Sequence, residues 1–134
     1  MDPIQEIKSR LRKYPHLRFR ESPNAIEIEA PCESGFSVGF TAEPNEFTVH
    51  FEGWHEHFET PEEALNCFAM GLTGEIRLAI TYRGASPVKY VLQYRDGESW
   101  ADDSTTGLLL QPFWRRARTE FRENPPLASV EAQA

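Results

Sequence analysis

A two-residue alternation of large apolar and polar side chains constrains the fold more than any other feature of this sequence. Residues 36–40 and 47–51 alternate Phe or Val with smaller or polar residues, and residues 76–82 and 88–94 continue the pattern with Ile, Leu, Val and Tyr. Because successive side chains of a strand point to opposite faces, this period predicts strands with one buried and one wet face. The turns between these strands are short, and short turns join antiparallel neighbours.

Three other segments carry helical signals. Residues 3–14 repeat apolar side chains at spacings of three and four. A central helix is predicted over residues 61–72, because Thr60 is a favoured N-cap and Glu63 completes a capping box. A short C-terminal helix is predicted to open at Pro112. The apolar faces of the three helices are predicted to hold Ile4, Ile7, Leu11 and Tyr14, then Ala64, Leu65, Phe68, Ala69 and Leu72, then Phe113, Trp114, Ala117 and Phe121.

The chain has 134 residues, which suits one domain, because chains divide only beyond about 250 residues. We predict a single α+β domain over residues 1–124 and a disordered tail over residues 125–134. Residues 17–30 alternate like the other strands and predict one more hairpin. The predicted order is α-ββββ-α-βββ-α, with about six to seven strands in one curved antiparallel sheet and the helices on one face. The polar run 102–107 after the third strand of the last group is predicted to be a loop.

Charge is distributed unevenly along the chain. The net charge is −7, and residues 21–75 contain twelve Glu but no Lys, Arg or Asp. Residues 1–20 hold six basic and two acidic side chains, and residues 113–122 hold four Arg and one Glu. Either the basic ends dock against the acidic middle, or an acidic surface attracts another protein with a basic surface.

Several function classes are disfavoured by composition. An acidic chain lacks the basic surplus that nucleic-acid binding requires, so no nucleic-acid partner is expected. No apolar run approaches the length of a membrane span, and no secretion signal is recognised, so we expect no membrane partner and a cytoplasmic location. Cys32 and Cys67 are then expected to be free thiols. The sequence leaves the oligomeric state open.

Residues 50–59 hold three of the four His side chains, interleaved with Glu. Imidazole and carboxylate groups bind divalent transition metals such as zinc, iron, nickel or manganese. His50, Glu52, His55 and His57 are therefore candidate metal ligands, and a metal-binding protein or metal-dependent enzyme is the alternative function. The same residues also suit a wet strand face and an ordinary polar loop.

No catalytic residue is predicted, because the chain lacks a nucleophile motif, a phosphate-binding loop and a positioned base. We therefore expect a non-catalytic protein-interaction or binding module without a cofactor. Its candidate interaction surface consists of Trp54, Glu56, Trp100, Asp102 and Asp103. A third hypothesis is a small-ligand pocket between the sheet and the helices.

Overall fold

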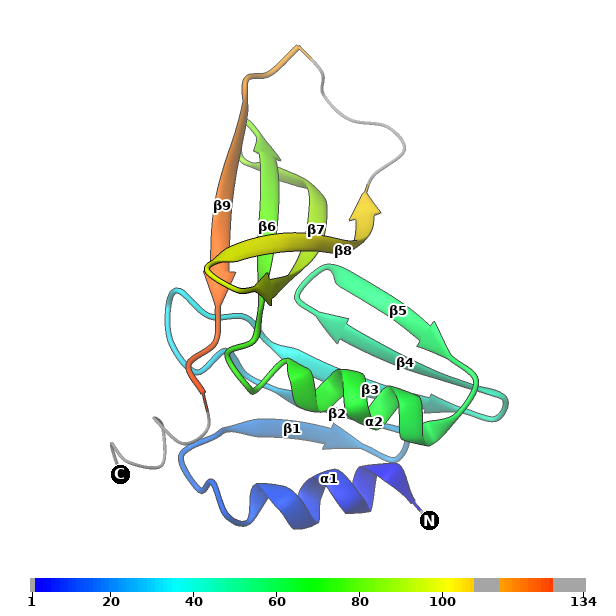
Figure 1. The fold of residues 1–134 in the computed structure, drawn as a ribbon. Coiled ribbons are helices and arrows are strands. Elements are labelled where there is room, and N and C mark those ends of the chain that lie inside the picture. Colours follow the sequence, from blue (N-terminus) through cyan, green and yellow to red (C-terminus); the bar gives the residue numbers. More distant parts are fainter. Residues whose placement is uncertain (1, 108–113, 127–134) are drawn as a thin grey trace.

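The computed structural model describes residues 2–107 and 114–126, which form an α+β fold with two antiparallel sheets (Figure 1). The elements are α1 (Pro3–Leu11), β1 (Phe19–Ser22), β2 (Ala25–Ile28), β3 (Val38–Glu43), β4 (Glu46–Phe51), β5 (Trp54–Phe58), α2 (Pro61–Met70), β6 (Ile76–Arg83), β7 (Ser86–Asp96), β8 (Ser99–Gly107) and β9 (Ala117–Glu123). The predicted fold class and antiparallel pairing are confirmed, whereas the predicted element order and single sheet are wrong.

The first sheet has the order β1-β2-β3-β4-β5, so each strand pairs with its neighbour in sequence. Both predicted hairpins are present, with Ile28 opposite Phe19 in one and Val49 opposite Phe40 in the other. Strand β5 was not predicted, because four of its five residues are aromatic or imidazole side chains that do not alternate in polarity. Figure 1 shows α1 and α2 on one side of this sheet, which we call its helix-facing side.

Local capping signals define where both helices begin. The Asp2 carboxylate accepts a hydrogen bond from Ile4 N at 3.0 Å, and the Thr60 hydroxyl accepts one from Glu63 N at 3.3 Å. These side chains satisfy backbone donors that have no partner inside the helix. The helices end at Leu11 and Met70, slightly before the predicted ends. No helix of the described residues is long and apolar enough to cross a membrane.

The second sheet has the order β8-β7-β6-β9. The predicted loop 102–107 is wrong, because these residues belong to β8 and pair with β7. The predicted C-terminal helix is also wrong, because residues 117–123 form β9 and pair with β6. Residues four apart share a strand face as well as a helix face, so the spacing of Ala117 and Phe121 suited either structure. Residues 108–113, where a short strand or the start of this helix was predicted, lie outside the described residues.

One continuous apolar core joins the two sheets and the two helices. The inner side of the second sheet contributes residues such as Leu78, Ile80 and Leu92, which pack with the Phe-rich interior of the first sheet. Asn124 follows β9 and is the one buried polar side chain among the described residues. The predicted tail lies mostly outside the described part of the chain, which ends at residue 126.

Candidate functional site

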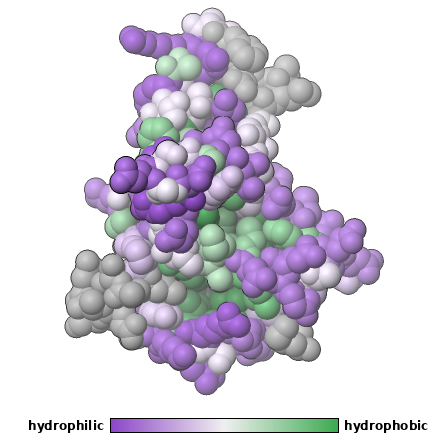
Figure 2. All heavy atoms as spheres, viewed as in Figure 1, coloured by the Kyte–Doolittle hydropathy of each residue, from purple (hydrophilic) through white to green (hydrophobic). Residues whose placement is uncertain are grey.

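An apolar pocket with two carboxylates on its wall lies where the two sheets and α2 meet. Its volume is about 290 Å³. Figure 2 shows apolar side chains gathered at the middle of this face, between the second sheet above and the helices below. We call it the inter-sheet pocket, and its lining residues are Phe51, Glu56, Phe58, Cys67, Met70, Ile76, Leu92, Tyr94 and Asp103.

Trp54 sets the position of the pocket by joining β5 to β8. Its indole stacks on the Phe51 ring with centroids 4.9 Å apart, and its Nε1 donates a hydrogen bond to Ser104 Oγ at 3.0 Å. One residue further along β5, His55 N donates to the Thr106 hydroxyl at 3.3 Å, and that hydroxyl donates to His55 O. These bonds cover the open edge of β5 and hold the second sheet across it.

Glu56 and Asp103 reach the pocket from different sheets. Glu56 lies on β5, on the same side of the sheet as its buried partner Val49. Asp103 lies at a bulge of β8, where the register with β7 shifts between Leu92 and Gln93. A bulge changes the direction of side chains locally, which places this carboxylate beside the pocket.

The electrostatics of the pocket are those of an anionic site without a cation. Burial raises the pKa of Glu56, and the charge of Asp103 raises the same pKa further. Ser104 Oγ donates to Asp103 Oδ2 at 3.3 Å. Among residues 2–107 and 114–126, no Lys or Arg forms an ion pair with either carboxylate. The two negative charges are therefore held together by the fold and are not neutralised within the described chain.

Cys67 supplies the only thiol of the pocket, and its environment keeps it protonated. Burial raises the pKa of Cys67 to about 12, and the nearby Glu56 and Asp103 charges raise it in the same direction. Because the thiolate is the reactive form of cysteine, this side chain is a poor nucleophile at neutral pH. It contributes apolar surface to the wall.

The candidate interaction surface is split by the fold. Trp54 has no exposed area, so its prediction as a surface residue is wrong: it packs on Phe51 and fills the junction between the sheets. Trp100 and Asp102 lie on the outer side of the second sheet, opposite Arg95 and Gln93. The Trp100 ring lies 4.6 Å from the guanidinium of Arg95, and Asp102 Oδ1 accepts from Gln93 Nε2 at 2.8 Å. Only the two carboxylates of the pocket come together.

The histidines lie on the other side of the first sheet. His50 pairs with Gly39 and His55 in neighbouring strands, alternating with the buried Val49 and Phe51, so these imidazoles lie opposite the helices. A Cβ atom on Gly39 would collide with the His50 ring, which shows how closely that ring covers the strand. Burial lowers the pKa of His50.

The other two histidines and Glu52 do not complete a metal site with His50. His57 Nδ1 lies 2.6 Å from Glu46 Oε1 and 2.8 Å from the Thr48 hydroxyl. Glu52 lies in the β4–β5 turn, where its carboxylate accepts a hydrogen bond from Ser37 N at 2.8 Å. In the described residues, no three His, Cys, Asp or Glu side chains are grouped closely enough to hold a metal ion.

Phe58, Met70 and Tyr94 are pocket residues that the sequence did not single out. Met70 and Tyr94 are 40% and 43% exposed, which is unusual for side chains of this size. Met70 lies outside the apolar arc predicted for the central helix, and this was the available signal that it faces something other than the core. Comparisons with protein-family models, with curated proteins and with solved structures found no match.

Proposed function

We propose that this protein is a non-catalytic module that binds a basic segment of another protein at the inter-sheet pocket. The observation that carries the proposal is the convergence of Glu56 and Asp103, from two different sheets, on one apolar pocket without a cation among the described residues. A partner Lys or Arg supplies the missing positive charge and neutralises both carboxylates.

The lining of the pocket suits the whole side chain of such a residue. Lys and Arg bury their aliphatic stems along apolar surface and keep the charged group at a polar position. Phe58, Met70 and Tyr94 provide that apolar surface, and the carboxylates provide the polar end. Arg and aromatic residues are enriched among the side chains that dominate protein interfaces.

The charge of the surrounding surface favours the same partner. The pocket receives Glu56 from the segment 21–75, which carries twelve Glu and no Lys or Arg. Long-range attraction accelerates the approach of a basic partner, and dissolved salt screens that attraction beyond about 8–10 Å. We therefore expect affinity to fall as salt concentration rises.

The pKa of Glu56 gives a second signature. A bound cation favours the ionised carboxylate, so binding lowers this raised pKa and releases a proton. Affinity therefore strengthens as pH rises through the pKa of Glu56.

A short acetylated and amidated peptide that alternates Arg and Lys with Leu is a direct probe. Its fluorescence anisotropy with the protein is measured at about 50 and about 500 mM NaCl. We expect Glu56→Gln with Asp103→Asn to weaken binding about tenfold, since each partly exposed ion pair is worth up to about 1 kcal/mol. The control pair, Asp96→Asn with Glu98→Gln, removes the same charge at the β7–β8 turn and leaves the pocket intact.

Equal weakening by the two double variants means that the peptide responds only to net charge, and this result contradicts the proposal. Binding that is unchanged between the two salt concentrations contradicts it as well. Amide chemical shifts that move at Glu56 and Tyr94 support the assigned position.

A further inference from the structure

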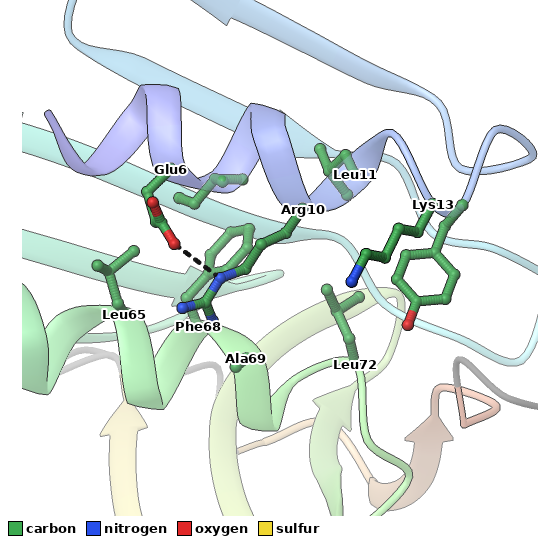
Figure 3. Close-up of a pocket in the computed structure, with 10 residues that line it drawn as sticks. Glu6, Arg10, Leu11, Lys13, Leu65, Phe68, Ala69 and Leu72 are labelled. Carbon is green, nitrogen blue, oxygen red and sulfur yellow. Dashed lines mark hydrogen bonds and ion pairs between the residues drawn. The ribbon is translucent and has the colours of Figure 1, made fainter.

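A second concave site, separate from the inter-sheet pocket, lies between the two helices (Figure 3). Its volume is about 320 Å³. We call it the helix groove, and its lining residues are Glu6, Ile7, Arg10, Leu11, Lys13, Tyr14, Leu65, Phe68, Ala69 and Leu72. Six of these side chains are apolar, and they come from both helices and from the residue that follows Gly71.

The groove is open because each helix packs mainly on the sheet below it. Ile7 and Leu11 of α1 are buried, and Phe68 of α2 packs edge-on against Phe40 of β3 with ring centroids 6.1 Å apart. These large side chains point toward the sheet and form the floor of the groove. Ala69 lies beside them on α2, where its small side chain leaves space that a larger residue would fill.

The charges at the rim are unequal. Arg10 Nε donates to Glu6 Oε1 at 3.0 Å, so these two groups neutralise each other across one turn of α1. Lys13 has no acidic partner among residues 2–107 and 114–126. Figure 3 shows its ammonium group over the groove, at the end where Leu11 and Leu72 meet. The rim therefore carries one uncompensated positive charge above an apolar floor.

We propose that the helix groove binds a small amphipathic carboxylate, such as an alkyl carboxylate of medium length. The carboxylate pairs with the Lys13 ammonium, and the alkyl chain covers the apolar floor around Phe68 and Ala69. The single unpaired cation matches one negative charge, and the floor matches an uncharged chain. This site is distinct from the proposed protein-binding pocket, with which it shares no lining residue.

The size of the groove favours a small molecule over a helix of another protein. The helices α1 and α2 have 9 and 10 residues, so each is only about 14–15 Å long. Stable protein interfaces bury about 1,200–2,000 Å², which such a short pair of helices does not provide by itself. A volume of about 320 Å³ is close to the lower limit for small-ligand sites.

Isothermal titration calorimetry with hexanoate, octanoate and decanoate tests this assignment. Each added methylene that reaches the floor should tighten binding about fourfold. Decylammonium, with the same chain and the opposite charge, should bind more weakly than decanoate. Lys13→Gln should weaken decanoate binding about fivefold, because the lost ion pair is solvent-exposed. The control Arg12→Gln removes the neighbouring positive charge, which does not line the groove, and should leave binding unchanged.

A second variant tests the floor. Ala69→Leu fills the groove and should weaken decanoate binding at least about tenfold, while thermal unfolding confirms that the variant is folded. Met70→Leu changes the adjacent residue, which lines the inter-sheet pocket, and should leave binding unchanged. The assignment is overturned if decanoate does not bind, if decylammonium binds equally well, or if Ala69→Leu has no effect. Weakening by Met70→Leu alone would place the ligand in the other pocket and would also overturn it.

Discussion

Asn124 joins three separate parts of the fold through one buried amide, and replacing it tests how strongly those parts depend on each other. Its side chain is 2% exposed. Its Oδ1 accepts a hydrogen bond from Phe36 N at 2.8 Å, and its Nδ2 donates to Phe36 O at 3.0 Å and to Gly71 O at 2.9 Å. The residue after β9 is thereby tied to the segment before β3 and to the end of α2.

The cost of Asn124→Ala follows from these contacts. Three hydrogen bonds are lost, and each contributes about 1 kcal/mol net. The Phe36 N–H and two carbonyl groups then stay buried without a partner, which adds to the loss. We expect the free energy of unfolding to fall by about 3–5 kcal/mol, a large part of the roughly 5–15 kcal/mol typical of a domain.

Urea unfolding followed by circular dichroism measures this change. With a slope of about 2 kcal/mol per molar urea, the midpoint should fall by about 1.5–2.5 M. Asn66→Ala is the matched control, because Asn66 is exposed on α2 and its replacement should change stability by less than about 0.5 kcal/mol. A loss of less than about 1 kcal/mol for Asn124→Ala would refute the reasoning.

Asn124→Asp provides a second, pH-dependent check. The Asp carboxylate keeps the acceptor for Phe36 N but replaces the amide donor with a negatively charged oxygen facing two carbonyl groups. Burial and these carbonyls favour the protonated acid, so its pKa in the folded protein should rise above that in the unfolded chain. Stability of this variant should therefore recover as pH falls through the raised pKa, and a flat pH profile would contradict this account.

Three further predictions concern single side chains. Cys32 is exposed and should react with Ellman's reagent at about pH 8, whereas Cys67, with a pKa of about 12, should react only after unfolding; two prompt thiols would contradict the pocket geometry. Burial lowers the pKa of His50 below its ordinary value of 6.5, so the unfolded chain binds the extra proton between the two values. Stability should therefore decline as pH falls below 6.5, less steeply in His50→Asn, as urea titrations at several pH values will test. Thr60→Ala should cost about 1 kcal/mol because it removes the α2 cap, whereas Thr60→Ser should be nearly neutral in thermal unfolding.

The local elements of the fold followed from the sequence because their causes lie within a few residues. The alternation around Phe40 and Val49 specified a hairpin, and the Thr60 signal specified where α2 begins. The same reasoning failed for residues 117–123, since a spacing of four residues fits a strand face and a helix face equally. The free edge of β6 decided in favour of the strand, and that edge is absent from local sequence.

The candidate site shows the same division. The sequence by itself determined that Glu56 and Asp103 are acidic and that the chain lacks a local cation to pair with the first of them. Only the tertiary structure decided that these two carboxylates, 47 positions apart, face one pocket, and that Trp54 is buried between the sheets. The physical reason is that periodicity assigns a side chain to a face of its own strand. Which strands then meet across a junction depends on long-range packing and on features such as the bulge in β8.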